Sequence, residues 1–241
     1  MKLKAILKLQ LHFMLRKVYR GFKSLFGPKP MIRQNDGSIQ WYGTQYGGFY
    51  VKKDLIGPQS IVYSFGIGED ISFDLEVIER HGCRVFAFDP TPRSIQWIGQ
   101  QSLPAQFQFY GYGLHTETGE VTFNLPRNKK HVSGSVVDIE TLDSSNSIKV
   151  PMRSFADIIA EMRHDKIDVL KIDIEGSEFS VIESILSSGV DITQILIEEH
   201  QRFFPDGAEK LKQLFELFTL NNYLLFASSP SGQELSFVKV V

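Results

Sequence analysis

Cysteine is the residue that this chain most lacks, because Cys83 is the only one among 241 residues. A single cysteine excludes an intrachain disulfide framework and any zinc site built on several thiolates. It is typical of a protein from a reducing compartment, or of one whose fold is indifferent to redox conditions. Hydrophobic residues make up 42% and charged residues 22% of the chain, which is ordinary for a folded soluble domain and argues against extended disorder.

Acidic residues are missing from the first 30 positions, which carry eight Lys and Arg. The remaining residues include 18 basic and 28 acidic side chains, so the main body of the chain is negatively charged. An acidic body argues against a broad surface for nucleic acid, and we expect no nucleic-acid partner.

Residues 1–28 have the pattern of a basic amphipathic helix, with apolar residues at helical spacing beside a purely cationic arc. Charged and polar residues interrupt the apolar ones, so no run of about 18 apolar residues is available to span a membrane. We also expect no secretory signal. Two interpretations stay open: a helix on an anionic membrane surface, or a helix packed on the body or a partner. The sequence therefore predicts a cytoplasmic protein, peripheral at the membrane under the first interpretation.

The rest of the chain alternates between short apolar runs and amphipathic segments. Residues 29–58, rich in glycine and aromatic residues, are predicted to be a capping segment, and residues 59–241 the catalytic domain. The alternation predicts a parallel sheet with helices on both faces, which binds ligands beyond the carboxyl ends of its strands. We expect strands at 60–65, 84–88, 107–112, 121–124, 167–172 and 194–198, helices at 72–80, 92–101, 154–162, 178–187 and 208–220, a loop at 128–147, and a closing hairpin at 223–227 and 235–240.

A glycine turn follows the first predicted strand, with Gly66 and Gly68 leading into Glu69 and Asp70. Asp89 ends the next strand, 21 residues after Gly68, where a carboxylate can accept hydrogen bonds from ribose hydroxyls. The alternative is that these glycines serve only a tight turn. The spacing favours a nucleoside-binding loop.

The same turn discriminates between nucleoside cofactors. A dinucleotide fingerprint has a third glycine, but this chain has Ile71 there. Glu69 and Asp70 also place negative charge where a pyrophosphate would lie. The pattern disfavours NAD and favours a ligand with ribose and a cationic centre, such as S-adenosylmethionine.

Acidic clusters follow two later strands of the predicted sheet. Asp173 and Glu175 lie at the exit of one strand, and Glu199 and His200 end the next. Buried carboxylates are costly unless paired, so these groups should face a cleft, a cation or a substrate. Asp173, Glu175 and His200 are the candidate catalytic residues, with His200 or Asp173 as general base. Asp173, Glu199 and His200 are candidate ligands of a divalent metal. The alternative is a set of solvated strand-end charges.

Several stretches resemble the FkbM-like family of S-adenosylmethionine-dependent methyltransferases. They are VYSFGIGEDISFD at 62–74, FAFDPTP at 86–92 and LKIDIEGSE at 170–178, while YGGFYV at 46–51 and ILIEEH at 195–200 fit one branch of the family. The resemblance implies a class I methyltransferase fold. That fold is α/β and Rossmann-like, with a seven-stranded, mostly parallel sheet, one antiparallel strand from a C-terminal hairpin, and helices on both faces.

The resemblance also implies roles for individual residues. Asp173 matches the acid of the fourth strand, near the transferred methyl group. One departure is Ser64, because many class I enzymes have an acid two residues before the first glycine. The family commonly methylates hydroxyl oxygens, which implies an O-methyltransferase with a sugar or glycan acceptor. The expected cofactor contacts are Phe65, Gly66, Gly68, Glu69, Asp70, Asp89, Pro90, Gly113 and Leu114.

Two other functions stay open. An NAD-dependent oxidoreductase or epimerase could use the same sheet, but the third glycine and a Tyr/Lys catalytic pair at a strand end are lacking. A non-catalytic, membrane-attached binding module would keep the fold without turnover, and Ser64 keeps this alternative open.

Overall fold

The computed structural model describes residues 37–126 and 142–240. The helix predicted at 1–28 and most of the loop predicted at 128–147 lie outside the described residues. Within the described ranges, no helix is both long and apolar enough to cross a membrane.

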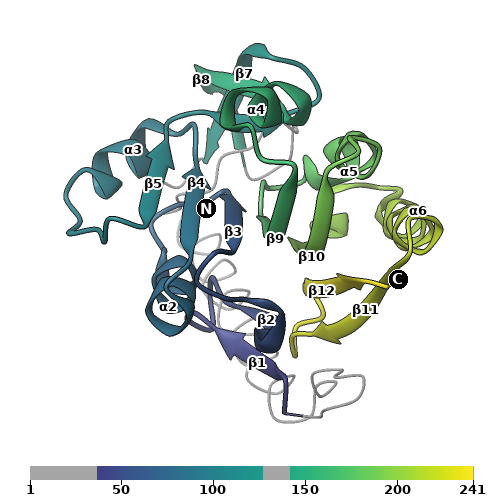
Figure 1. Ribbon diagram of the computed structural model, residues 1–241. Coiled ribbons are helices and arrows are strands. Elements are labelled where there is room, and N and C mark those ends of the chain that lie inside the picture. The colour runs from purple at the N-terminus through teal and green to yellow at the C-terminus, as the bar shows by residue number, and fades with distance from the viewer. Residues whose placement is uncertain (1–36, 127–141, 241) are drawn as a thin grey trace, which may run out of the picture.

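Seven strands form the central sheet (Figure 1), in the order β11-β12-β10-β9-β3-β4-β5. Neighbouring strands are parallel except where β12 pairs with β10 and β11. The predicted mostly parallel sheet, with one antiparallel strand from the C-terminal hairpin, is therefore confirmed. The strands are β3 Ile61–Phe65, β4 Arg84–Phe88, β5 Phe107–Tyr110, β9 Lys166–Ile172, β10 Asp191–Glu198, β11 Tyr223–Ser228 and β12 Glu234–Lys239.

Both faces of the sheet are covered, which explains why its central strands read as continuous apolar runs. Successive side chains of a strand point to opposite faces. Tyr63 and Phe65 of β3 therefore join the apolar cluster under α4, α5 and α6, whereas Val62 joins the cluster under α2. Figure 1 shows the same division of the helices. The helices are α2 Ser72–His81, α3 Pro92–Ile98, α4 Phe155–Met162, α5 Glu178–Leu186 and α6 Gly207–Leu220, with short 3-10 turns η1 Lys53–Leu55 and η2 Gln201–Phe203.

The segment predicted as a cap contains a two-stranded hairpin, β1 Ile39–Tyr42 and β2 Phe49–Lys52. Its aromatic side chains Tyr42 and Phe49 are buried in the cluster beneath α2. The side-chain amide of Gln194 in β10 hydrogen-bonds both the N–H and the C=O of Lys52, at 2.7 and 3.2 Å. The hairpin is therefore fastened to the main sheet.

The strand predicted at 107–112 is shorter than expected, because β5 ends at Tyr110. The chain then leaves the main sheet and forms a separate sheet of three strands, in the order β6-β8-β7. These strands are β6 Gly113–His115, β7 Gly119–Pro126 and β8 Leu142–Ser154, so part of the predicted loop is a strand. Val150 and Met152 of β8 pack on Phe123 of β7, in the alternating pattern of a half-buried strand.

Candidate active site

The loops that carry the predicted site residues meet at the carboxyl edge of the sheet. The N–H of Gly66, after β3, donates to the carbonyl of Phe88 at 2.9 Å. The N–H of Asp173, after β9, donates to the carbonyl of Phe65 at 3.0 Å. These bonds extend the sheet by one residue and hold the glycine turn between the loop of Asp89 and the loop of Asp173.

Gly66 occupies a position that only glycine can take. Its φ is +77°, in the left-handed region, and a Cβ there would overlap the carbonyl oxygen of Asp173. The close approach comes from the parallel pairing of β3 and β9, which places residues 66 and 173 side by side. The glycine turn and the first acidic cluster are thus in direct contact.

Replacing Gly66 with alanine should destabilise the fold and disorder the glycine turn. Left-handed strain alone costs about 1–3 kcal/mol, and the overlap with Asp173 adds to it. We expect thermal unfolding to begin well below that of the wild type. Gly119→Ala is the matched control, because its Cβ would meet nothing within 4 Å and its φ is not positive. Equal melting of the two variants would contradict this account.

Asp89 is the buried acid beside the glycine turn, with 5% of its surface exposed. Its Oδ2 accepts the N–H of Gly68 at 2.9 Å, and its Oδ1 accepts the N–H and hydroxyl of Thr91 at 2.9 and 2.6 Å. Burial raises the pKa of Asp89, while the bonds from Thr91 and Gly68 oppose that shift. A carboxylate oxygen can accept about two hydrogen bonds, and Oδ2 accepts the N–H of Gly68, so Oδ2 can also accept a ligand hydroxyl. This donor set suits a ribose.

The other predicted cofactor contacts are placed differently. The side chains of Phe65 and Leu114 lie wholly within the core, so only their backbones could face a ligand. Glu69 forms a two-point ion pair with Arg93, at 2.9 and 2.6 Å. Gly113 packs against Pro90, because a Cβ on it would lie 2.9 Å from the proline ring.

Asp70 fastens α2 to the β1–β2 turn, whereas it was expected at the cofactor. Its Oδ1 accepts the N–H of Ser72 at 2.8 Å, and its Oδ2 accepts the hydroxyl of Thr44 at 2.6 Å. Burial opposes ionisation, but these hydrogen bonds outweigh it and lower the pKa of Asp70. Asp70 thus stays negatively charged, and its charge is stabilised by the hydrogen bonds that join α2 to the β1–β2 turn.

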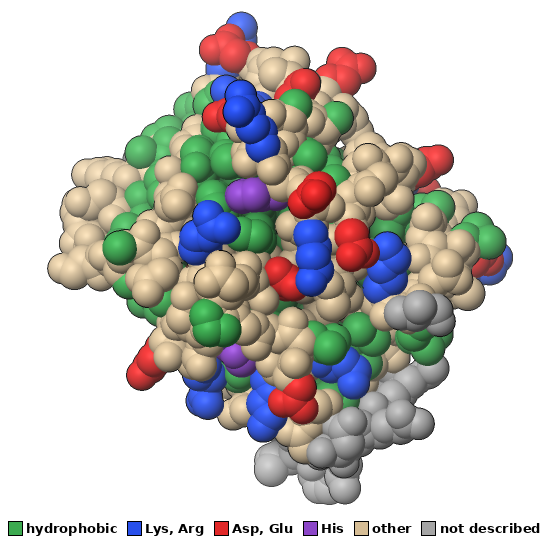
Figure 2. All heavy atoms as spheres, viewed as in Figure 1, with side chains coloured by type: hydrophobic (Ala, Val, Ile, Leu, Met, Phe, Trp, Pro, Cys, Tyr) green, Lys and Arg blue, Asp and Glu red, His purple; other side chains and the backbone are tan. Residues whose placement is uncertain are grey.

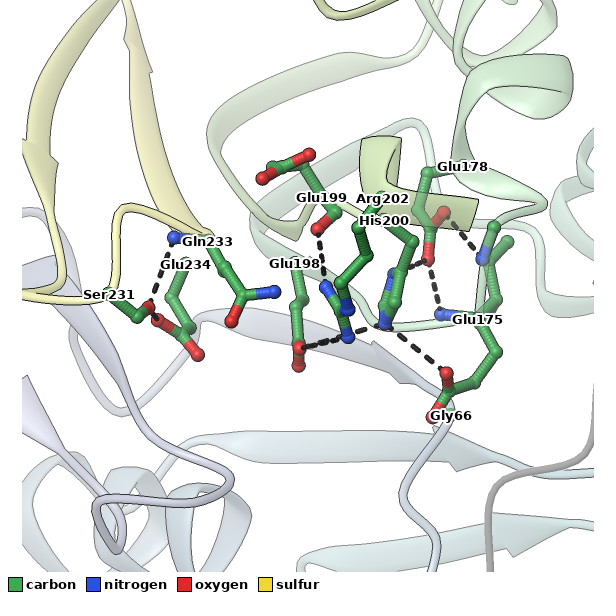
Figure 3. Close-up of polar contacts among 12 residues, drawn as sticks. Gly66, Glu175, Glu178, Glu198, Glu199, His200, Arg202, Ser231, Gln233 and Glu234 are labelled. Atoms are coloured by element: carbon green, nitrogen blue, oxygen red, sulfur yellow. Dashed lines mark hydrogen bonds and ion pairs between the residues drawn. The ribbon is translucent and has the colours of Figure 1, made fainter. Parts of the chain in front are cut away.

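Glu178, in the first turn of α5, organises the second half of the site (Figure 3). Its side chain is 0% exposed. Its carboxylate accepts the N–H groups of Ile174 and Gly176, each at 2.9 Å, and lies 2.9 Å from Nδ1 of His200. Because the carboxylate can only accept, Nδ1 carries a proton and Nε2 faces away from Glu178. The sequence predicts for such a residue only a favourable interaction with the helix dipole.

His200 is the centre of the cluster and is 1% exposed. Its Nε2 lies 3.3 Å from Oε2 of Glu175 and 3.6 Å from Oε1 of Glu198 (Figure 3). Ligand atoms of Asp173, Glu175 and His200 all lie within 4.8 Å of one another. The three predicted catalytic residues are therefore brought together, and Glu198 joins them.

The cluster holds more protons at neutral pH than its isolated groups would. Burial would lower the pKa of His200, but the hydrogen bond and charge of Glu178, with the charges of Glu175 and Asp173, raise it to about 9. Burial, followed by the charge of Asp173, raises the pKa of Glu198 to about 8. Burial also raises the pKa of Asp173. His200 is therefore cationic at pH 7, and Glu198 is mostly protonated there.

Glu199 does not join the cluster, contrary to the expectation that it serves as a metal ligand. Its carboxylate accepts the N–H of Gln201 at 2.8 Å and points away from Glu175 in Figure 3. The physical reason is strand alternation, because adjacent residues at the end of β10 point to opposite sides. Glu198 takes the expected place. The groups that could hold a divalent cation are thus Asp173, Glu175, Glu198 and His200.

A hollow of about 480 Å³ lies at the opposite, amino-terminal edge of the sheet. It is far in the fold from the glycine turn and the acidic cluster, since it borders the starts of β3, β4 and β9. On the face of the molecule that Figure 2 shows, Lys and Arg side chains are interspersed with Asp and Glu. The described part of that face therefore has no extended basic stripe. The lining residues are 57–61, Arg84, 163–166 and Asp168.

Comparisons with known proteins point to one family. A family model described as the methyltransferase FkbM domain matches residues 60–225. The human "Probable methyltransferase-like protein 24" is 27% identical over 154 residues, which are 63% of this chain and 36% of that protein. The "Hexuronic acid methyltransferase AglP" of Haloferax volcanii is 22% identical over 182 residues, 69% of this chain and 72% of that protein. This chain thus spans about a third of the human relative.

Solved structures also show a similar fold. Among them is the crystal structure of methyltransferase FkbM from Methylobacillus flagellatus KT, with a TM-score of 0.51 and 15% sequence identity. The match covers 79% of this chain and 46% of that one.

Proposed function

This chain belongs to the FkbM methyltransferase family, whose methyl donor is S-adenosylmethionine, and we propose that it is an O-methyltransferase acting on a hydroxyl of a sugar or glycan. The observation that carries the proposal is the contact between two halves of the site. Gly66, in the nucleoside-binding turn, packs directly on Asp173, whose carboxylate belongs to the cluster around His200. A methyl donor and a proton acceptor can therefore lie side by side.

The first half of the site holds the nucleoside. Asp89 has one acceptor position left for a ribose hydroxyl, while its bond to Gly68 fixes the glycine turn. When bound, S-adenosylmethionine supplies an electrophilic methyl group on a positively charged sulfur. Acidic walls tolerate such a ligand, because opposite charges attract across a cleft of low dielectric constant.

The second half of the site takes up the proton of the acceptor hydroxyl. An alcohol is a weak nucleophile at pH 7, so a neighbouring base must accept its proton as it reacts. Glu198 and His200 become bases as the pH rises toward their pKa values of about 8 and about 9. The carboxylate of Asp173 lies in the same cluster as His200. Glu178 holds the imidazole in position for this role.

A sugar acceptor is favoured by two independent considerations. Several carboxylates at one edge can accept hydrogen bonds from several hydroxyls at once. In addition, one relative with 22% identity is named a hexuronic acid methyltransferase. Under the first of the two interpretations of residues 1–28, a helix on an anionic membrane surface would bring the enzyme to a membrane-linked glycan.

The cluster offers a second chemistry for the same reaction. Three carboxylates with one imidazole nitrogen form a mixed oxygen and nitrogen donor set that suits a divalent cation. Nδ1 of His200 is bound by Glu178, which leaves Nε2 directed at the carboxylates, as in metal-bound histidines. A cation there would hold the acceptor hydroxyl and lower its pKa.

The proposal predicts that S-adenosylhomocysteine, the product form of the cofactor, binds and that NAD does not. Calorimetric titration of the full chain with each ligand measures this. Asp89→Ala should weaken S-adenosylhomocysteine binding by about 10–100-fold, because it removes a charged acceptor and the anchor of Gly68. Asp54→Ala, an exposed acid on η1, is the control and should bind as the wild type does.

Each contrary result has a distinct meaning. If the protein binds NAD and not S-adenosylhomocysteine, the result would favour an NAD-dependent oxidoreductase or epimerase over a methyltransferase. Binding of S-adenosylhomocysteine without methyl transfer to any neutral or acidic sugar would favour a binding module. Transfer of a labelled methyl group from S-adenosylmethionine to a sugar hydroxyl supports the whole proposal.

A further inference from the structure

An arginine, Arg202, lies beside the carboxylates of the cluster around His200. It belongs to the turn η2, which directly follows His200, and its Nη2 is 3.7 Å from Oε1 of Glu198. Its guanidinium carbon lies 4.8 Å from the ring centre of Phe203, so the planar group rests on an aromatic ring. The side chain is still 44% exposed. A positioned positive charge is therefore accessible to a ligand at the edge of the cluster.

Most of the hydrogen-bond donors of Arg202 are available to a ligand. A guanidinium group carries five N–H groups. Nη1 donates to the carbonyl of Glu199 at 3.2 Å, and the 3.7 Å separation from Glu198 is too long for a hydrogen bond. Within residues 37–126 and 142–240, the guanidinium forms no other hydrogen bond or ion pair. Enough donors therefore remain for a two-point contact with a ligand.

A glutamine, Gln233, approaches the same carboxylate from the hairpin of β11 and β12. Figure 3 shows its side-chain amide directed toward Glu198, which lies between Gln233 and Arg202 in that view. The pairing of β10 with β12 explains this position, because Glu198 is in register with Glu234, the next residue after Gln233. In the part of the chain that the structure describes, the side-chain amide of Gln233 has no hydrogen-bond partner. It is a second polar group available to a ligand.

The turn between β11 and β12 holds Gln233 in place through its backbone. The carbonyl of Gln233 accepts the N–H of Glu199 at 2.9 Å, and its N–H donates to Oγ of Ser231 at 3.1 Å. The neighbouring carboxylate of Glu234 accepts the hydroxyls of Ser229 and Ser231. Glu234 is thus occupied within the turn, whereas the amide of Gln233 can bind a ligand.

A guanidinium and an amide at this place have the chemistry of a carboxylate subsite. The carboxylates of the cluster can accept hydrogen bonds from sugar hydroxyls, but they repel an anion. A guanidinium group binds a carboxylate through two parallel N–H···O bonds, and its charge offsets that repulsion. We propose that Arg202 and Gln233 are specificity residues that bind the carboxylate of an acidic sugar, so that the acceptor is a uronic acid. This inference rests on the proposed function, because it places the acceptor beside the groups that take up its proton.

The test compares pairs of sugars that differ only in carrying a carboxylate or a hydroxymethyl group. The acids are the methyl glycosides of glucuronic, galacturonic and mannuronic acid, and their neutral partners are those of glucose, galactose and mannose. The initial rate of methyl transfer from saturating S-adenosylmethionine gives kcat/KM of the full chain for each sugar. We expect the wild type to prefer the acid of at least one pair by about 10–100-fold, the effect of one charge-assisted hydrogen-bonded contact.

Arg202→Gln should abolish this preference, because it removes the charge and the paired donors. The ratio of the two kcat/KM values is the readout, since a general change in the chemical step affects both sugars of a pair alike. Arg202→Lys should keep part of the preference, because it keeps the charge without the planar pair of donors. Gln233→Leu should lower the preference by about threefold to tenfold, the effect of one hydrogen bond. Arg84→Gln, an exposed arginine at the amino-terminal edge of the sheet, is the control and should keep the wild-type preference.

The outcomes separate this inference from the proposed function. Equal kcat/KM for both sugars of every pair, a preference for the neutral sugars, or an unchanged preference in Arg202→Gln would overturn the inference and leave an O-methyltransferase. If the wild type methylates none of the six sugars, the proposed function fails, and saturation-transfer NMR of the protein with S-adenosylhomocysteine then measures their binding. Binding of an acid that is lost in Arg202→Gln would support the carboxylate subsite. Absent binding, or equal binding of acids and neutral sugars, would overturn it.

Discussion

Replacing His200 with asparagine should lower turnover by about 100–10,000-fold, the range that a positioned acid–base group contributes. His200 lies among Glu175, Glu178 and Glu198. Asparagine keeps one hydrogen bond to Glu178 but cannot take up or share a proton. The affinity for S-adenosylhomocysteine should change little, because Asp89 and the glycine turn bind the nucleoside. The measurement is the initial rate of methyl transfer to the best sugar acceptor.

The pH dependence of the wild type follows from the same cluster. Both His200, with a pKa of about 9, and Glu198, with a pKa of about 8, carry protons at pH 7 and lose them as the pH rises. Proton-accepting capacity therefore increases with pH, and we expect turnover to rise between about pH 7 and 9. His200→Asn should flatten the upper part of this rise.

Glu199→Gln is the matched control for His200→Asn. Its carboxylate is next to His200 in the chain but is bound to the N–H of Gln201 outside the cluster, so turnover should stay within about threefold of the wild type. Near-normal turnover in His200→Asn would contradict a base at this position. A second experiment tests for a divalent cation in the cluster. If EDTA abolishes turnover and Mn²⁺ restores it, His200 acts as a cation ligand.

The sequence predicts the position of a site residue well when that residue comes directly after a buried strand. Gly66, Asp89 and Asp173 each come one residue after a buried apolar strand, and parallel strands end at the same edge. Periodicity and strand order therefore suffice to bring them together. The hairpin within the capping segment and the strand at 142–154 are harder to predict from the sequence. Their polar residues are typical of loops, and the strands with which they pair cannot be identified from periodicity.

The remaining site residues depend on geometry that the sequence does not contain. Which of Glu198 and Glu199 enters the cluster is decided by the phase of β10 at its last residue, where a shift of one position reverses the answer. Glu178 reaches back over the turn at 174–176, and its role depends on the left-handed conformation of Glu175.

The largest loss of stability should follow from replacing Glu178 with alanine. Its buried carboxylate binds two backbone N–H groups and His200, so truncation leaves three donors without a partner. Breaking a buried charged network costs about 3–5 kcal/mol, and in a chain of this size that lowers the melting temperature by about 6–20 °C. Glu183→Ala, an exposed residue of the same helix, should stay within about 0.5 kcal/mol of the wild type.

The pH dependence of this loss identifies its electrostatic part. The pKa of His200 is raised from 6.5 to about 9 in the folded protein, so its ion pairs stabilise the fold fully below about pH 6.5 and cease to do so above pH 9. The difference in stability between wild type and Glu178→Ala should therefore narrow as the pH rises from 6 to 10. The difference in stability that persists at high pH comes from the hydrogen bonds that Glu178 accepts from the N–H groups of Ile174 and Gly176. A gap that is constant over this range would mean that Glu178 acts only through the backbone of the turn and that His200 is held by its other neighbours.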